Sequence, residues 1–291
     1  MAAPTSQIFS PFGFQDLFSI WSRYPDAVLF AGGSEFIRKQ GSNVPILPRN
    51  IISLDNMAEL KKISRTERYL EIGAMVKLNQ IIQLGKIVPD ALSICIEGIA
   101  GPHLLNIATV GGNICCHSRR LDLAAPMTAL DAQFELRTAQ TTRWISASRF
   151  LCFPGSIGIA DHEILTRIRV PLEPWTYTWY LKLHSNVSSD PAGSMLFMIR
   201  NQKDVLTNIR VVYSGKTVLR EKSIEGIVEG KYLPLDSNTA ENFAERWKSY
   251  LAVLDGNEDS IYPGEDENFC PDLTKTQILN FIETNLMHIS D

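Results

Sequence analysis

The stretch NIATVGGNICCHSRRLD, residues 106 to 122, is the most informative part of this 291-residue chain. Most of it lies within a segment, Gly98 to Ser118, that contains no aspartate, glutamate, lysine or arginine. The segment is long enough to cross a bilayer, but its four glycines, its proline and its asparagines would leave backbone groups unpaired in lipid. We therefore expect a turn-rich segment here and not a membrane span.

A second glycine pair occurs in a similar setting earlier in the chain. Gly32–Gly33 follows the apolar run VLF, and Gly111–Gly112 follows NIATV; a small polar residue, Ser34 or Asn113, comes next. Paired glycines let the backbone approach a ligand closely and turn several N–H groups to one side, which forms a concave site for a pyrophosphate. If SEFIRKQ begins a helix, its N-terminus adds a favourable partial charge. The alternative is two ordinary tight turns.

Other motifs give no convincing catalytic or metal site. Neither glycine pair belongs to a G-x-G-x-x-G fingerprint, so a Rossmann domain is not supported. Cys115, Cys116 and His117 are consecutive, and adjacent side chains of an extended segment point to opposite faces, which is poor geometry for one zinc ion. We interpret these cysteines as buried structural residues. The histidines are scattered without a triad pattern, which suits a protein whose chemistry belongs to a bound cofactor.

The composition is that of an ordinary globular protein. Hydrophobic residues make up 45% and charged residues 21% of the chain, which excludes a disordered segment. The net charge is −4 and there is no lysine or arginine cluster, which argues against nucleic-acid binding. The opening residues, MAAPTSQIFSPFGFQDLF, do not resemble a signal peptide, and the five cysteines form no C-x-x-C pair. We expect a cytoplasmic protein.

Helical and strand patterns alternate up to about residue 172, which indicates an α+β or mixed α/β unit. The helical patterns cover residues 11–24, 34–41, 76–85, 88–100 and 121–130. The strand patterns cover residues 27–30, 44–48, 50–54, 69–74, 132–138, 142–146 and 163–172. Pro171 and Pro174 then mark a domain boundary near residue 172.

The last third has a different texture and predicts a smaller α+β domain. Three strands are expected at 175–184, 195–200 and 205–213, and the polar turn RNQKDV joins the last two as a hairpin. Two amphipathic helices are expected at about 238–254 and 273–287. This unit therefore reads as a three-stranded antiparallel sheet plus helices.

Three segments in this order, VLFAGGSEFI, IAGPHLLNIATVGGNI and LDLAAPMTALDAQFEL, resemble the FAD-binding subunit or middle domain of the xanthine dehydrogenase family of molybdenum hydroxylases. The likeness covers about residues 7 to 172 and is thin afterwards. It implies an FAD-binding domain of the vanillyl-alcohol oxidase type (PCMH-like) over residues 1–172, in two subdomains of about 1–54 and 55–172. A C-terminal domain of the molybdenum hydroxylase flavoprotein type would follow at 173–291.

The resemblance also implies which residues contact the flavin. Asp122 matches an aspartate that hydrogen-bonds the sugar-alcohol chain of the flavin, and Lys182 matches a lysine near the ring. Ile99 would place an apolar side chain against the cofactor, and Leu165 would make a backbone contact at the ring; the alternatives are a core isoleucine, a core leucine and a solvated lysine. The two loops that would surround the diphosphate comprise Leu29, Phe30, Ala31, Gly32, Gly33, Ser34, Glu35, Phe36, Thr109, Gly111, Gly112 and Asn113.

As to function, the resemblance implies an electron-transfer subunit. Substrate would be oxidised at a molybdenum cofactor in a large partner subunit, and electrons would pass through two-iron two-sulfur clusters in a small partner to FAD and then to NAD⁺ or another acceptor. Such clusters need four closely spaced thiolates, which this chain lacks, so they would belong to other chains. Two alternatives are a flavin-free subunit that only holds an assembly together, and a stand-alone FAD-dependent reductase of the cell-wall-precursor type.

Overall fold

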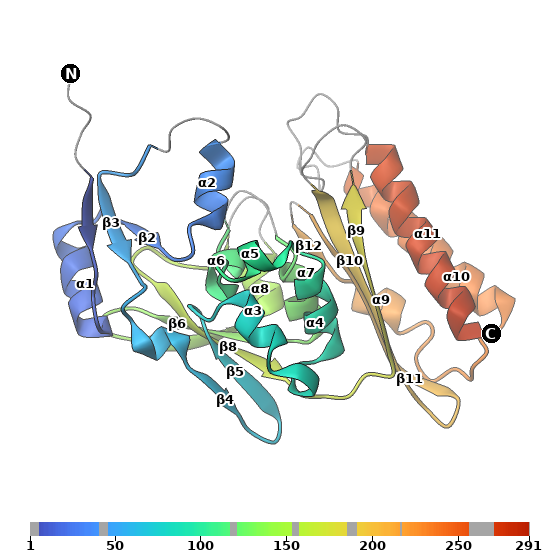
Figure 1. The fold of residues 1–291 in the computed structure, drawn as a ribbon. Helices are drawn as coiled ribbons and strands as arrows, with labels where there is room; N and C mark the ends of the chain where they lie inside the picture. The colour runs from blue at the N-terminus through green and yellow to red at the C-terminus, as the bar shows by residue number, and fades with distance from the viewer. Residues whose placement is uncertain are drawn as a thin grey trace.

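A computed structural model describes residues 6–40, 46–116, 121–152, 157–184, 191–215, 217–255 and 271–290. Three β-sheets follow one another along the chain, with helices packed between and beside them (Figure 1). The first is a small parallel sheet with the spatial order β1 (Gln7–Phe9), β3 (Asn50–Ser53) and β2 (Val28–Phe30). Helix α2 (Ser34–Gln40) follows β2 directly after the first glycine pair.

Helix α1 (Phe14–Arg23) packs against this sheet. Its apolar residues recur at helical spacing, so Phe14 and Leu17 lie on one face and are buried with Ile52 of β3 in a common cluster. The 3₁₀-helix η1 (Ala58–Lys61) adds Leu60 to the same cluster. The small sheet is thereby held firmly beside the next one.

The second sheet is antiparallel and has five strands. In spatial order they are β4 (Ile63–Arg65), β5 (Tyr69–Gly73), β8 (Ile164–Pro171), β6 (Gln133–Arg137) and β7 (Thr142–Ser146). One face is apolar, because alternate residues such as Ile72 and Val170 point into the main core. The opposite face carries an ion-pair network in which Arg167 bridges Glu71 and Glu135 at 2.9 and 2.7 Å.

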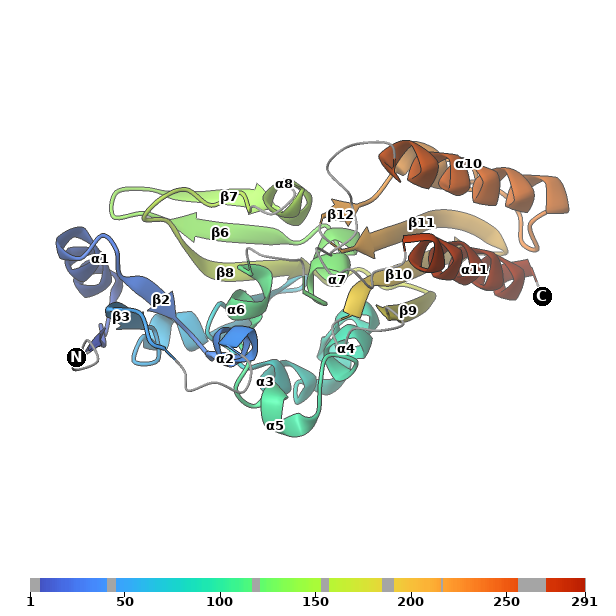
Figure 2. The same ribbon diagram turned by 90° about the horizontal axis from the view of Figure 1, so that it is seen from above.

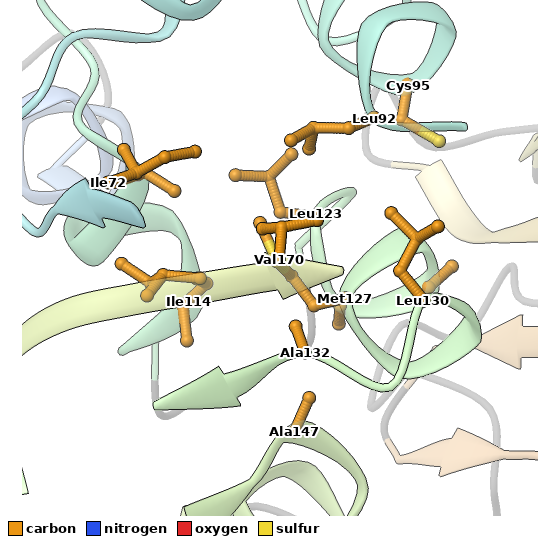
Figure 3. Packing of buried hydrophobic residues seen from close by; sticks show 14 of the residues in the cluster. Ile72, Leu92, Cys95, Ile114, Leu123, Met127, Leu130, Ala132, Ala147 and Val170 are labelled. Atoms are coloured by element: carbon orange, nitrogen blue, oxygen red, sulfur yellow. The ribbon is translucent and has the colours of Figure 1, made fainter. Parts of the chain in front are cut away.

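Short helices cover the apolar face of this sheet. Figure 3 shows Leu92 and Cys95 of α4, Ile114 of α6 and Met127 of α7 converging with strand residues in the core. The helices on this side are α3 (Leu78–Ile82), η2 (Gly85–Ile87), α4 (Asp90–Glu97), α5 (Pro102–Leu105), α6 (Val110–Ile114), α7 (Ala124–Ala129) and α8 (Ala147–Leu151). Their short lengths leave many loops at one edge of the core, where the candidate site lies.

The third sheet is also antiparallel, with the order β12 (Val218–Leu219), β11 (Val205–Ser214), β10 (Pro191–Gln202) and β9 (Tyr177–His184). Helices α10 (Ser237–Asp255) and α11 (Pro271–Ser290) lie together on one side of it, with α9 (Lys222–Glu225) nearby (Figure 1). The expected three-stranded sheet is thus corrected to four strands, because the two residues of β12 are too few to show an alternating pattern.

Both faces of the third sheet are buried. Phe197 on β10 joins the cluster beneath α10 and α11, while the neighbouring Leu196 and Met198 join the main core. Arg210 of β11 strengthens this contact, since it pairs with Asp131 at 2.8 Å and donates to the carbonyl of Ala129. The C-terminal sheet is therefore packed directly on the helices of the preceding part.

Most of the expected helices and strands are confirmed, with two differences besides the fourth strand of the third sheet. Residues 46–48 form no strand, and residues 44 and 45 lie outside the described residues. Gly111 and Gly112 lie inside helix α6, not in an open turn, because this helix starts one residue before them. Among the helices that the structure describes, none is both long and apolar enough to cross a bilayer.

Candidate functional site

The structure brings the two glycine pairs into contact. A Cβ added to Gly32 would overlap the carbonyl oxygen of Ile107, and one added to Gly112 would lie 3.9 Å from the Cβ of Ala31. The thiol of Cys116 also reaches a carboxylate oxygen of Glu35 at 3.9 Å. Helices α2 and α6 accordingly lie side by side in both views (Figures 1 and 2). The two predicted glycine loops therefore lie against each other.

The first loop presents backbone donors. Gly33 has φ +70°, a left-handed conformation, and a Cβ added there would lie 2.5 Å from Cζ of the Phe30 ring, so a side chain would be both strained and overlapped. Such a residue turns successive N–H groups toward one side of the chain. Within the described ranges, the amides of Gly32, Gly33 and Ser34 make no hydrogen bond to the chain. Three neighbouring donors are thus available for an anion.

The second loop is different, because its amides are already bonded within the fold. Thr109 caps helix α6, and its Oγ1 accepts a hydrogen bond from the amide of Gly112 at 3.0 Å. A Cβ on Gly111 would lie 2.7 Å from the carbonyl oxygen of Ala74. The remaining amides of this turn form the bonds Val110 N to Val76 O, Gly111 N to Ala74 O and Asn113 N to Thr109 O, at 3.0, 2.8 and 3.0 Å. The prediction that both pairs expose their N–H groups is therefore wrong for this pair.

Asn113 connects this helix to the segment that carries Asp122. Its side-chain oxygen accepts a hydrogen bond from the amide of Leu123 at 3.2 Å, in the buried interior. This bond fixes the backbone immediately after Asp122 relative to the second glycine pair. Asn113 thus helps to fix the position of Asp122, the residue that precedes Leu123.

Asp122 is the centre of a polar cluster that joins the two parts of the molecule. Its Oδ1 accepts a hydrogen bond from the Tyr180 hydroxyl at 2.8 Å and lies 3.2 Å from the ammonium of Lys182. Lys182 also donates to the carbonyls of Gly98 and Ile99, each at 3.3 Å. We call these five residues the Asp122 junction. Strand β9 is thereby tied to the loop after α4 and to the segment before α7.

The electrostatics of the junction keep its tyrosine protonated. Burial, followed by the nearby Asp122 carboxylate, raises the pKa of Tyr180 far above its ordinary value. The phenol is therefore protonated and a hydrogen-bond donor at neutral pH. Burial likewise raises the pKa of Cys95, and that of Cys115 to about 12.

Cys95 and Cys115 are consequently protonated thiols and poor nucleophiles or metal ligands. Cys116 is buried, as the interpretation of structural cysteines requires, while His117 lies outside the described residues. Over the ranges given above, no group of three or more His, Cys, Asp or Glu side chains could hold a metal ion.

Other predicted residues take more ordinary positions. Leu165 is 3% exposed and pairs with Leu136 across the second sheet, which is the position of a core strand leucine. Leu29 and Ala31 are partly buried against the cluster around α1. Phe30 and Phe36 meet edge to face with ring centroids 5.8 Å apart, which links the strand before the first loop to the helix after it.

Sequence reasoning missed two residues, Tyr180 and Lys77. Tyr180 precedes Lys182 by two positions, so both side chains lie on the same face of β9, and this spacing was the available signal. Lys77 donates to the carbonyl of Ile107 at 3.2 Å, and burial lowers the pKa of its ammonium. It thereby holds the carbonyl that faces Gly32, a contact that no local pattern announces.

Comparisons with known proteins give a consistent result. Residues 4–173 match the family described as the FAD binding domain in molybdopterin dehydrogenase. The chain is 31% identical over 162 residues to the xanthine dehydrogenase FAD-binding subunit of Escherichia coli O157:H7, and this match spans 55% of each chain, about half the length of that relative. It is 20% identical over 264 residues to the nicotine 6-hydroxylase medium subunit of Paenarthrobacter nicotinovorans, covering 88% of this chain and 92% of that one.

Solved structures share the fold over the whole chain. Quinoline 2-oxidoreductase from Pseudomonas putida 86 aligns with a TM-score of 0.81 at 19% identity, covering 100% of this chain and 98% of that chain. The carbon monoxide dehydrogenase from Hydrogenophaga pseudoflava aligns with a TM-score of 0.80 at 21% identity, with the same coverage. At these identities the likeness concerns the fold alone.

Proposed function

The chain belongs to the family of FAD binding domains in molybdopterin dehydrogenases, and from this premise we propose that it is the FAD-binding electron-transfer subunit of a multi-subunit molybdenum hydroxylase of the xanthine dehydrogenase type. The observation that carries the proposal is the first glycine loop. Three consecutive amides, those of Gly32, Gly33 and Ser34, have no partner among the described residues and lie beside the second glycine pair. Such an arrangement fits the oxygens of a diphosphate.

The residues on both sides of this loop suit a dinucleotide. Leu29 to Phe36 would surround the FAD diphosphate, with the three amides as donors. Thr109, Gly111, Gly112 and Asn113 would form the facing wall, where the exposed Gly112 carries no side chain and lets the cofactor approach closely. The wall would contribute shape, since its own amides are bonded within the fold.

The Asp122 junction would hold the flavin end. Asp122 would accept hydrogen bonds from the sugar-alcohol chain, and Lys182 would place a positive charge near the ring. Ile99 would offer an apolar contact and Leu165 a backbone contact. When bound, FAD supplies the oxidation and reduction chemistry, while these residues bind and orient it and keep water from its apolar surface.

The wider assembly follows from the same reading. The fold would be that of vanillyl-alcohol oxidase-type flavoproteins over residues 1–172, with subdomains of about 1–54 and 55–172 and a C-terminal domain at 173–291. Partners would be a large molybdenum-cofactor subunit and a small iron–sulfur subunit, and NAD⁺ or another acceptor would receive the electrons in the cytoplasm. Relatives described as medium chains or medium subunits support the idea of a multi-subunit assembly.

An absorption spectrum tests cofactor and acceptor together. The purified chain, mixed with FAD and freed of excess by gel filtration, should retain one FAD per chain and show a flavin spectrum that NADH bleaches without oxygen. Retained flavin that NADH does not bleach would point to a different acceptor. A chain that retains no flavin would favour the flavin-free structural subunit. Co-purification with molybdenum- and iron-containing chains would separate a subunit from a stand-alone reductase.

A further inference from the structure

We propose that Tyr180 is a positioning residue for the cofactor, because its hydroxyl holds the carboxylate of Asp122 in the orientation that receives the sugar-alcohol chain of the flavin. The inference rests on the proposed flavin site and adds a residue from the C-terminal sheet to it. It also gives that sheet a direct part in retaining the cofactor.

The two carboxylate oxygens of Asp122 differ in their contacts. The Tyr180 hydroxyl and the Lys182 ammonium both engage Oδ1 of Asp122, at 2.8 and 3.2 Å. Within the part of the chain that the structure describes, Oδ2 has no hydrogen-bond partner. One oxygen therefore anchors the carboxylate to the fold, and the other is left for hydroxyl donors of a ligand.

The ring of Tyr180 packs against Gly98, where the absence of a side chain leaves room for it. A Cβ on Gly98 would lie 2.9 Å from Cε1 of Tyr180, so the ring packs where any other residue at position 98 would stand. The carbonyls of Gly98 and Ile99 then receive the Lys182 ammonium. Ring, ammonium and carboxylate are thus fixed together.

Two donors on one oxygen also restrict how the carboxylate can turn. The side chain of Asp122 is 14% exposed and that of Lys182 is 20% exposed, so neither is free in solvent. A lysine ammonium is a point charge on a flexible stem and fixes distance better than direction. The phenol is held by its rigid ring, and its short hydrogen bond therefore sets the direction in which Oδ2 points.

The test uses the full chain, three single variants and the double variant at Tyr180 and Asp122. Tyr180→Phe removes the hydroxyl and keeps the ring against Gly98; Tyr177→Phe makes the same change at an exposed position of the same strand. Asp122→Ala removes the carboxylate that Tyr180 is proposed to position. FAD affinity is measured by the change in flavin fluorescence, and ADP affinity by competition. ADP contains the diphosphate but lacks the sugar alcohol.

We expect Tyr180→Phe to raise the FAD dissociation constant about tenfold, as for loss of a hydrogen bond to a charged group, and to leave ADP affinity unchanged. Tyr177→Phe should leave both unchanged. In the Asp122→Ala background, which has no carboxylate to position, adding Tyr180→Phe should cost less than about twofold, because the two residues act through one contact. This non-additivity is a readout that a merely structural tyrosine would not give.

Three results with the variants would overturn the inference. Unaltered FAD affinity in Tyr180→Phe would show that the hydroxyl does not position the carboxylate. Equal losses for FAD and ADP would show a general disturbance of the fold. Full additivity of Tyr180→Phe with Asp122→Ala would show that the two residues act independently. If the unaltered chain binds ADP but not FAD, or neither, the proposed flavin site itself is wrong and the inference falls with it.

Discussion

The glycine loops and the Asp122 junction would hold opposite ends of one cofactor, and they are built in opposite ways. The loops use backbone, packed so closely that Gly32 and Gly111 face carbonyl oxygens of the chain itself. The junction uses charged and polar side chains from segments 58 residues apart. A backbone site permits few residue types and so leaves a local signature. A site made of side chains depends on how distant segments pack, and each of its residues can be substituted without changing the others, so it leaves no local pattern in the sequence.

The two loops also differ from each other in a way that refines this comparison. The first leaves three amides available, whereas the second uses its amides within the fold. Close packing and helix capping therefore explain why glycines occur at the second pair. If this pair contacts the cofactor, it does so through its shape and not through its N–H groups. The following predictions separate packing from binding, beginning with the largest effect.

Gly32→Ala should cost the most. The new Cβ would overlap the backbone carbonyl of Ile107, which cannot rotate away, so we expect the free energy of unfolding to fall by about 3 kcal/mol and FAD binding to be lost. Chemical denaturation measures the first effect. Gly101→Ala is the matched control, since nothing lies within 4 Å of a Cβ there, and it should change stability by less than about 0.5 kcal/mol. Equal stability of the two variants would refute the close packing.

Asp122→Ala should weaken FAD binding about thirtyfold, equivalent to about 2 kcal/mol, because a charged acceptor is removed while the loops still hold the diphosphate. Isothermal titration measures the change. ADP affinity serves as the internal control and should remain within twofold of that of the unaltered chain, by the same reasoning on contacts. An FAD affinity equal to that of the unaltered chain would remove Asp122 from the site.

Gly112→Ala should have a moderate effect. Its Cβ would lie 2.8 Å from Oγ1 of Thr109, a side-chain atom that can rotate at the expense of the helix cap, so we expect a loss of about 1 kcal/mol in stability. Thr109→Val loses the same cap without adding a group at position 112. If Gly112 faces the cofactor, only Gly112→Ala weakens FAD binding beyond the shared loss; equal binding by both would assign Gly112 to packing alone.

Glu163→Gln should have the smallest effect on FAD binding and provides a baseline for a change in the fold away from the site. Hydrogen bonds from Arg143, both at 2.7 Å, lower the pKa of Glu163 below its ordinary value despite opposing desolvation. A lowered pKa stabilises the fold above the pKa of the unfolded chain, and this stabilisation disappears as the pH falls through the folded value.

The Glu163→Gln variant should therefore be about 1 kcal/mol less stable at pH 7, a modest value because Arg143 is half exposed, and the deficit should shrink in acid. Denaturation at pH 7 and at about pH 4 measures it. FAD affinity at pH 7 should not change. A deficit that grows toward low pH would contradict the assigned direction of the pKa.

Sequence patterns predicted most of the elements because apolar periodicity is local. Helix α1 and strand β8 show clear spacings of buried residues, whereas β12 is too short to show one. Helix α6 was missed because its two glycines suggest a turn, and only the Thr109 cap and tertiary packing make the segment helical.

The parts of the site that are formed by residues close together in the sequence could be predicted, and the parts formed by distant residues could not. The contact between the glycine loops followed from a family resemblance in the motifs, and the structure brings the loops together. Tyr180 could not be found in this way, because its role depends on Asp122 far away in the sequence. The sequence also could not show that the amides of the second glycine pair are hydrogen-bonded within the fold while those of the first are not, because the two pairs have similar sequences.

A crystal structure of the chain with FAD tests the central claim most directly. The account predicts that the amides of Gly32, Gly33 and Ser34 donate to the diphosphate, and that Oδ2 of Asp122 accepts from the sugar-alcohol chain. A diphosphate bound away from these amides, or a flavin chain that makes no contact with Asp122, would contradict it.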